Sequence, residues 1–135
     1  MKTETIRVKT NHKTELVDIT QDIQKKIKTS GFKNGIIMAY VPHTTSAITI
    51  NENADPDVRK DILMILDQMV PGKAGYLHAE GNSAAHIKAS LVGQSVLFCI
   101  EDGNPVLGTW QGIFLCEFDG PRSRRVDINY IAGSK

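Results

Sequence analysis

The sequence predicts one α+β domain over residues 1–135, with mostly antiparallel strands and about three helices. Segments with strand patterns gather toward both ends of the chain, and helix patterns lie between them. Strict alternation of strand and helix, which would indicate a doubly wound sheet, is absent. A chain of 135 residues without a Pro-, Gly- or Ser-rich linker fits one domain. Such a domain buries roughly 65 to 70% of its extended surface.

Several segments have the pattern of β-strands. Some alternate apolar and polar residues, as half-buried strands do, and others are continuous apolar runs typical of buried strands. Turn residues at 11–13, 102–104 and 119–121 separate neighbouring runs. The predicted strands are residues 4–9, 15–19, 35–41, 46–50, 95–101, 109–118 and 124–131.

Three segments have the pattern of helices. The first has isoleucines four residues apart, begins at Thr20, which can cap it, and ends at Gly31. The second begins at Asp55-Pro56, because aspartate accepts hydrogen bonds from free amides and proline fits the first helical position, and it stops at Pro71-Gly72. The third begins near Asn82 or Ser83 and ends at Gly93. The residues expected to face inward are Ile19, Ile23 and Ile27 in the first helix, Val58, Ile62, Ile65, Leu66 and Met69 in the second, and Ile87 and Leu91 in the third.

The composition argues against two classes of protein. A formal net charge of +1 gives no overall field to steer the chain to nucleic acid, so any anion site must be local. No segment approaches the ~20 apolar residues needed to span a bilayer, and the charged N-terminus does not resemble a signal peptide. We therefore expect a cytoplasmic protein without nucleic-acid or membrane partners.

The two cysteines lie in apolar, strand-like runs. Cys99 and Cys116 therefore suit buried, reduced thiols, as expected in a cytoplasmic protein. A disulfide is the alternative if their strands are neighbours in a hairpin.

Three of the four histidines lie beside small polar residues and carboxylates. His43 stands in Pro-His-Thr-Thr-Ser, and His78 and His86 stand at the two ends of a nine-residue segment. Imidazole is the commonest protein ligand of zinc-like ions, and a catalytic zinc site uses three protein ligands and leaves one position open. The trio predicts a divalent metal site, zinc-like rather than magnesium-like because magnesium prefers oxygen ligands. Ordinary hydrogen-bonded histidines are the alternative, since the spacing matches no zincin or zinc-knuckle motif.

Two glutamates are candidates for handling protons at this site. Glu80 follows His78 by two residues, and Glu52 follows the strand after His43. A carboxylate can orient a metal-bound imidazole or act as a base. The alternative for both is a solvated loop carboxylate.

Other polar residues are candidates for binding phosphate. Guanidinium groups suit phosphate, but strand alternation lets at most two of the three arginines near residue 122 reach one ligand. The start of the third helix offers backbone amides and a favourable dipole. Trp110 is predicted to lie in the core or an interface, and its neighbour Gln111 to face the other way. The predicted phosphate or substrate contacts are Arg122, Arg124, Arg125, Asn51, Ser83 and Gln111.

Four blocks of the chain together resemble the secondary thiamine-phosphate synthase, or YjbQ-like, family. The resemblance covers nearly the whole chain, and the combination of blocks is specific although no single block is. The segment between His78 and His86 is shorter than in some members of the family. The blocks are residues 43–47 with 51–58, His78 with residues 80–82, residues 85–91, and residues 107–113 leading to Glu117.

The resemblance implies a small α+β protein with a β-sandwich-like sheet core, a homotrimer and a histidine-lined cavity for a metal ion. It implies His43, His78 and His86 as ligands and arginines at 122–125 as phosphate contacts. It also implies a weak activity that joins the pyrimidine pyrophosphate and thiazole phosphate halves of thiamine and releases pyrophosphate. Two alternatives stay open: a metal-hydroxide hydrolase of a small phosphorylated or cyclic substrate, and a non-enzymatic metal- or metabolite-binding protein.

Overall fold

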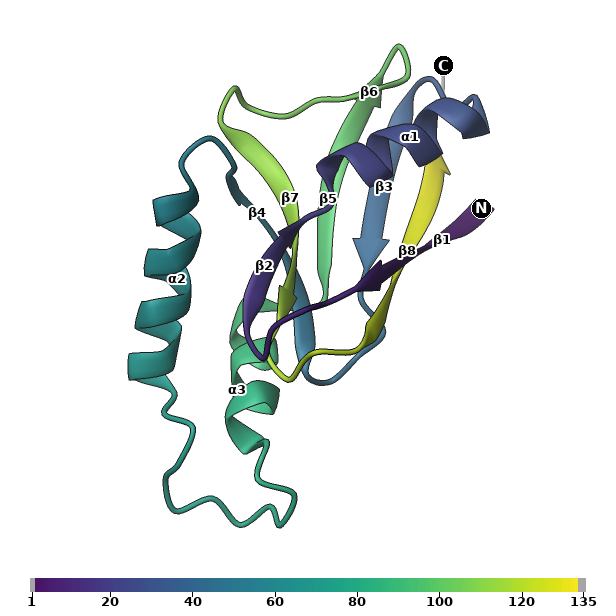
Figure 1. Cartoon of the computed structure of the whole chain (residues 1–135). Coiled ribbons are helices and arrows are strands. Elements are labelled where there is room, and N and C mark those ends of the chain that lie inside the picture. Colours follow the sequence, from purple (N-terminus) through teal and green to yellow (C-terminus); the bar gives the residue numbers. More distant parts are fainter. Residues whose placement is uncertain (1, 134–135) are drawn as a thin grey trace.

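Two antiparallel sheets and three helices make up the structure, a computed structural model that describes residues 2–133 (Figure 1). The helices are α1 (Thr20–Ser30), α2 (Pro56–Met69) and α3 (Ser83–Val92). The strands are β1 (Lys2–Lys9), β2 (Glu15–Asp18), β3 (Gly35–Tyr40), β4 (Ser46–Glu52), β5 (Ser95–Glu101), β6 (Asn104–Pro105), β7 (Gln111–Glu117) and β8 (Ser123–Ala132). The predicted α+β class with mostly antiparallel strands is confirmed.

The two sheets share one chain that crosses between them repeatedly. The larger sheet has the order β1-β8-β3-β5-β6, and the smaller has the order β2-β7-β4. Three short crossings, residues 10–14, 41–45 and 118–122, connect β1 to β2, β3 to β4 and β7 to β8, while residues 106–110 connect β6 to β7 at the opposite end of the sheets. These three crossings lie at the same end of the molecule, at the bottom of Figure 1.

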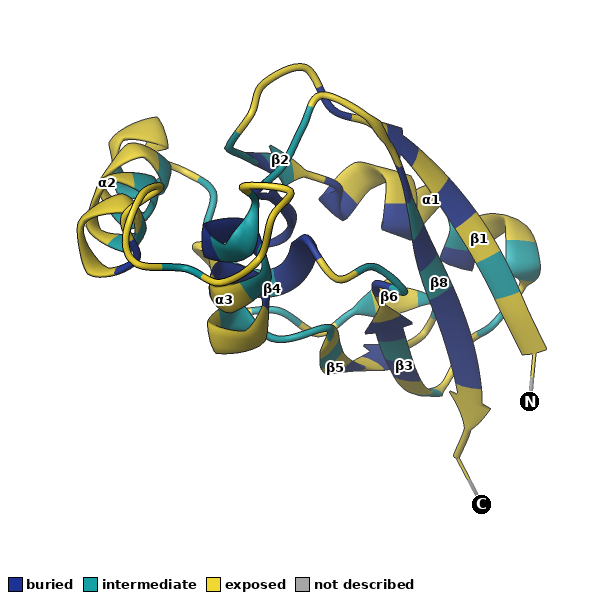
Figure 2. Ribbon diagram, turned by 90° about the horizontal axis from the view of Figure 1, so that it is seen from below, coloured by how far each residue is buried: buried dark blue, intermediate teal, exposed yellow. Residues whose placement is uncertain are grey.

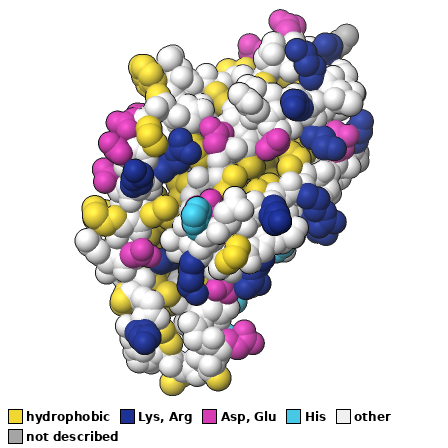
Figure 3. Space-filling view, viewed as in Figure 1, with side chains coloured by type: hydrophobic (Ala, Val, Ile, Leu, Met, Phe, Trp, Pro, Cys, Tyr) yellow, Lys and Arg dark blue, Asp and Glu magenta, His cyan; other side chains and the backbone are white. Residues whose placement is uncertain are grey.

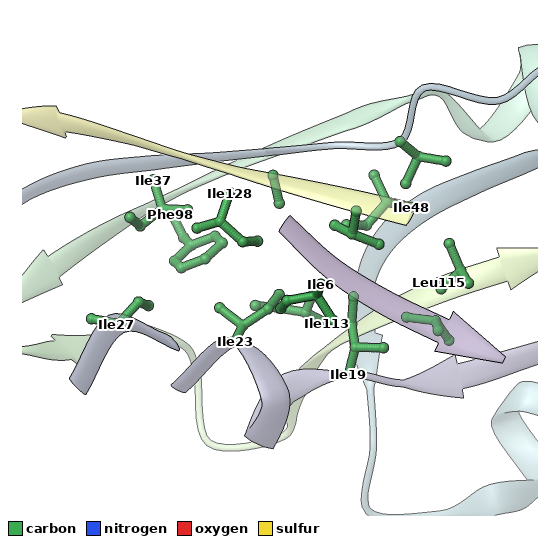
Figure 4. Close-up of a cluster of buried hydrophobic side chains, with 14 of the residues drawn as sticks. Ile6, Ile19, Ile23, Ile27, Ile37, Ile48, Phe98, Ile113, Leu115 and Ile128 are labelled. Carbon is green, nitrogen blue, oxygen red and sulfur yellow. The ribbon is translucent and has the colours of Figure 1, made fainter. Parts of the chain in front are cut away.

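The main core lies between the sheets and α1. Ile19, Ile23 and Ile27 have no exposed surface and pack with side chains of both sheets, as Figure 4 shows. The four-residue spacing of these isoleucines puts them on one face of a helix, so the predicted stripe of α1 is confirmed. Strand β7 supports a second core because its residues alternate: Ile113 and Leu115 enter the main core, and Phe114 and Cys116 face α3.

The predicted cap of α1 is wrong, whereas that of α2 is confirmed. Asp18 caps α1, because its Oδ1 accepts hydrogen bonds from the backbone N–H and the hydroxyl of Thr20 at 3.0 and 2.6 Å. The Thr20 hydroxyl instead accepts the Ile113 N–H at 2.9 Å, which ties α1 to β7. At α2, the Asp55 carboxylate accepts the Asp57 N–H at 2.9 Å.

The predicted inward stripe of α3 is wrong. Ile87 and Leu91 are exposed, and the face turned to the sheet carries alanines and Lys88. Alanines let the helix approach β4 and β7 closely, and this close packing decides the orientation where hydrophobicity alone pointed the other way.

Helix α2 is only loosely anchored to the rest of the protein. None of its residues is fully buried, and Figure 2 draws it almost wholly in the colours of exposed and intermediate residues. Ile62, Leu63 and Leu66 pack against the second core, whereas Ile65 and Met69 are exposed, so part of the predicted stripe is wrong. No helix described in residues 2–133 is long and apolar enough to cross a bilayer.

Two other expectations need correction. Cys99 is exposed on β5, whereas Cys116 is buried on β7, and both thiols are free. The two strands belong to different sheets, so the cysteines are not cross-strand neighbours. The strand expected from residue 109 begins at Gln111, and Trp110 stands 63% exposed in the turn before it. A turn over residues 108–111, in which the Gln111 N–H donates to the Gly108 carbonyl at 3.1 Å, occupies the first two residues of the predicted strand.

Truncating Ile23 should destabilise the protein far more than truncating Leu91. Ile23→Ala leaves a cavity in the main core, so we expect the free energy of unfolding to fall by about 2–5 kcal/mol. Leu91→Ala, at a position that is 58% exposed, should change it by less than about 0.5 kcal/mol. Urea unfolding followed by circular dichroism measures both variants. Equal losses would contradict the orientation assigned to α3.

Candidate functional site

The candidate residues divide between the two ends of the smaller sheet. Strand β4 pairs with β7 so that Ser46 lies opposite Glu117 at one end and Glu52 lies opposite Gln111 at the other. Seven strand residues at about 3.3 Å each separate these ends by roughly 20 Å. The histidines and arginines of the prediction belong to the first end, and Asn51, Glu52 and Gln111 belong to the second.

A buried ion pair occupies the first end, where the chain crosses between the sheets. Glu117 and Arg124 have exposures of 0% and 2%. The Arg124 Nε donates to Glu117 Oε1 at 2.9 Å, and its Nη2 donates to Glu117 Oε2 and to the Thr45 hydroxyl, the latter at 2.8 Å. The Thr10 hydroxyl donates to Glu117 Oε1 at 2.7 Å. These bonds join all three crossings in one polar network.

The Glu117 carboxylate is held in its charged form. Burial alone would raise its pKa, but hydrogen bonds from Arg124, Thr10 and the Asp119 backbone, with the charge of Arg124, lower it. Gly120 is required beside it, because a Cβ there would collide with the His12 carbonyl and the Glu117 side chain. The first crossing therefore lies directly over the carboxylate.

His43 lies in the second crossing and is oriented by the backbone of β8. Its Nε2 accepts the Arg125 N–H at 2.9 Å. Burial lowers the pKa of His43, and the charges of Arg124 and Arg125 lower it further. The imidazole is therefore neutral near pH 7, and because Nε2 accepts, the proton is on Nδ1. In this arrangement His43 offers a hydrogen-bond donor, while the Nε2 lone pair that a metal ion would need is already used.

His78 and His86 lie against one another. Their ring centroids are 5.7 Å apart in an edge-to-face arrangement. The exposed Glu80 carboxylate lies 3.7 Å from His78 Nε2, within ion-pair range although beyond a good hydrogen bond. Within residues 2–133, no group of three or more His, Cys, Asp and Glu side chains is placed to hold a metal ion. One chain thus brings together two of the three predicted ligands, and His43 is not grouped with them.

Asp119 links the start of α3 to the crossings. Its carboxylate accepts from Asn82 Nδ2 at 3.0 Å and from Arg122 Nη2 at 3.0 Å, and it pairs with Lys13 Nζ at 3.3 Å. Burial alone would raise the pKa of Asp119, but the donors Asn82 and Lys13 and the neighbouring positive charges lower it. Ser83 is half-buried at the first position of α3, beside this link.

The three arginines have different surroundings. Arg124 is buried and points inward, so it positions the crossings and has no route to a ligand in solution. Arg122 and Arg125 have side chains about half exposed, at 51% and 43%, and pair with Asp119 and Asp127. The sequence predicted that at most two of the three arginines could reach one ligand, because neighbouring residues of a strand face opposite sides. Arg122 and Arg125 are the two whose side chains are accessible.

The far end of β4 carries the other candidates. The Gln111 Oε1 accepts the Gly108 N–H at 2.7 Å, so this side chain closes its own turn. The Asn51 Oδ1 accepts the Glu52 N–H at 2.7 Å. Glu52 makes no side-chain hydrogen bond or ion pair to another described residue. These three residues are separate from the histidines within one chain.

Sequence reasoning missed Thr10 and Asp119. Glu117 did carry a signal, because it is a lone carboxylate in the apolar run 113–118 and cannot be buried without a cationic partner. Arginines follow within eight residues, so the pairing could have been inferred. Thr10 and Asp119 look like ordinary turn residues, and only the fold brings them to the network.

Residues 4–133 match the family model described as UPF0047 protein YjbQ-like. A UPF0047 protein of Methanocaldococcus jannaschii is 55% identical over 125 residues, which span 93% of this chain and 91% of that protein. The chain belongs to the YjbQ family. The YjbQ-family protein YugU of Bacillus subtilis is 49% identical over 89% of this chain and 92% of its own length.

Solved structures of similar proteins have the same fold. An uncharacterized conserved protein of the family from Clostridium acetobutylicum superposes with a TM-score of 0.92 at 50% identity, covering 95% of this chain and 99% of that one. A hypothetical protein from Aeropyrum pernix gives 0.93 at 33% identity, covering 98% and 100%. The names of these relatives state no reaction.

In this YjbQ-family protein, Glu117→Gln should be strongly destabilising. The substitution leaves the buried Arg124 charge without its partner, so we expect a loss of about 3–5 kcal/mol in the free energy of unfolding at pH 7. Glu101→Gln on the exposed face of β5 should cost less than about 0.5 kcal/mol. Urea unfolding measures both.

The Glu117–Arg124 pair should also make the free energy of unfolding depend on pH in the acid range. Because the pKa of Glu117 is lowered in the folded protein, its stabilisation is complete above the unfolded value of about 4.3 and is lost as pH falls through the folded value. As the pH falls below about 4.3, wild type should therefore lose more stability than Glu117→Gln. Parallel acid profiles would mean that the carboxylate is not ion-paired.

Proposed function

We propose that this protein is an enzyme acting on small phosphorylated metabolites, with a weak thiamine-phosphate synthase activity. It would join a pyrimidine pyrophosphate to a thiazole phosphate and release pyrophosphate. One observation carries the proposal: His43, the arginine turn and the start of α3 lie at one end of the molecule, fixed by the buried Glu117 and by Asp119. A rigid polar frame beneath accessible histidines and arginines supports catalysis better than a plain structural role.

The proposed reaction needs groups that stabilise a departing pyrophosphate. Breaking the bond between the pyrimidine methylene carbon and its oxygen places negative charge on that oxygen. Arg122 and Arg125 would supply cations, since their guanidinium groups are accessible. His43 would supply a neutral Nδ1–H donor, and Arg124 would position the loop through Thr45.

A zinc-like ion is proposed at the His78–His86 pair. The pair supplies two imidazoles of the three ligands that a catalytic zinc needs, and the described part of one chain adds no third. A single chain therefore does not fit the predicted three-histidine centre. The remaining ligand would have to come from a second copy, and Glu80 would orient His78.

A homotrimer is proposed as the working assembly. The outer face of the larger sheet exposes several apolar side chains: Ile36 on β3 lies opposite Ile131 on β8, and Leu97 on β5 lies opposite Met38, between Ile36 and Tyr40. On the face shown in Figure 3, by contrast, basic and acidic side chains are interspersed. Assembly is also the route by which Asn51, Glu52 and Gln111 could join the histidines, since β4 separates them within one chain.

Replacing His78 should remove the activity. With both thiamine precursors and zinc present, we expect wild type to form thiamine phosphate and His78→Ala to be at least about tenfold slower. His12→Ala, at the exposed fourth histidine, is the matched control and should match wild type. Chromatography of the product and metal analysis of the purified proteins provide the readouts.

Each outcome has a meaning for the proposal. Bound zinc without product would favour the non-enzymatic metal-binding alternative. Turnover that survives His78→Ala would remove the histidine pair from the reaction. Less than about a tenth of an equivalent of zinc, after supplementation, would exclude the metal centre.

Introducing a charge on the outer face of the larger sheet should break the assembly. Leu97→Glu places a carboxylate among apolar neighbours, so we expect the trimer measured by light scattering to become a monomer. Lys60→Glu, on the exposed side of α2, should leave the mass unchanged. A monomeric wild type at micromolar concentration would overturn this part of the proposal.

A further inference from the structure

A cavity of about 500 Å³ lies among α2, α3 and the first crossing. Its volume is in the range of small-molecule sites. Three lysines line it, Lys13, Lys73 and Lys88, together with the carboxylates of Asp67 and Asp119. The lining therefore has an excess of one positive charge.

Lys88 is the least expected residue of this lining. It has only 5% exposed surface and lies on the face of α3 that otherwise carries alanines. Its Nζ pairs with Asp67 of α2 and lies 5.9 Å from the centre of the Phe118 ring. An apolar side chain would fill this position without the cost of burying an ammonium group, so packing alone does not explain the lysine.

The cavity lies on a different side of α3 from the histidine pair. Ala84, Ala85 and Lys88 line it, whereas His86 does not. At 100° per residue, the direction of His86 differs from the middle of that face by roughly 150°. A ligand in the cavity would therefore be separate from one bound at His78 and His86.

Two further groups on the lining are available to a ligand. Lys73 makes no ion pair with a described residue. Asn82 donates its Nδ2 to Asp119, and its Oδ1 is buried without a donor among the described residues. The ionised Asp119 carboxylate can only accept hydrogen bonds, so the NH2 group of Asn82 must face it. The Asn82 atom without a partner is therefore the amide oxygen, an acceptor.

We propose that this cavity is a second binding site, for a small phosphate-bearing anion. Lys73 and Lys88 contact the phosphate oxygens as point charges, and Lys13 at the rim adds to the positive potential. A hydroxyl or amino group of the same ligand donates to Asn82 Oδ1. This inference does not depend on the proposed catalytic activity.

Titration of the full-length protein with inorganic phosphate tests the site. Calorimetry at low ionic strength should give saturable binding with a dissociation constant below about 10 mM. Lys73→Gln, an exposed substitution that spares the fold, should weaken it about tenfold, as expected for loss of a charged hydrogen bond. Lys88→Met, which keeps the volume and leaves only the exposed Asp67 unpaired, should do the same. Lys60→Gln on α2, outside the lining, should have no effect.

A second comparison separates this site from the arginines. Arg125→Gln removes phosphate bound at the arginine turn, so the Lys73-dependent part of the binding should persist in this variant because Arg125 does not line the cavity, and acetate should not compete for that part. Loss of binding in Arg125→Gln with retention in Lys73→Gln would place the anion at the arginine turn and overturn the proposal. Equal competition by acetate would show non-selective charge attraction, and absence of saturable binding by wild type would also overturn it.

Discussion

The ion pair between Glu117 and Arg124 holds together three places where the chain changes sheets. Two sheets that share one chain must be connected by crossings, and each crossing leaves backbone polar groups outside the ladders. Here Thr10 and Thr45, from two crossings, bond to the same pair that flanks the third. A charge pair buried without such partners would cost stability, so the threonines are what make this one tolerable.

The same network also determines how firmly each part of the candidate site is held. His43 cannot move independently, because its crossing is fixed by the Arg124–Thr45 bonds and its ring by the Arg125 amide. The histidines near α3 are held differently: His86 is held by the packing of α3 on the smaller sheet and by the Asn82–Asp119 bond, whereas His78 lies in the loop that follows α2. The site therefore combines a rigid half, built on the sheets, with a half that depends on the loop after α2.

The sequence predicted elements wherever one strong local pattern decided the outcome. Isoleucines four apart specified α1, and Asp55-Pro56 specified the start of α2. Prediction failed where packing decided between weak patterns, as in α3, whose alanines rather than Ile87 and Leu91 face the sheet. Glu117 and Arg124 also show the limit: the sequence indicates that a buried carboxylate at 117 needs a cationic partner, but which of the three nearby arginines is buried beside it depends on the fold. Only the topology reveals that β4 separates Glu52 from His43.

The weak anchoring of α2 has a consequence for access to the protein's interior. Asp67 is the salt-bridge partner through which this helix holds the buried ammonium of α3, and the apolar contacts beside it are only half-buried. Segments with so few buried contacts open locally at a small fraction of the global unfolding cost. A local opening of α2 would therefore break the Lys88–Asp67 pair and expose the Lys88 ammonium to solvent while both sheets stay intact.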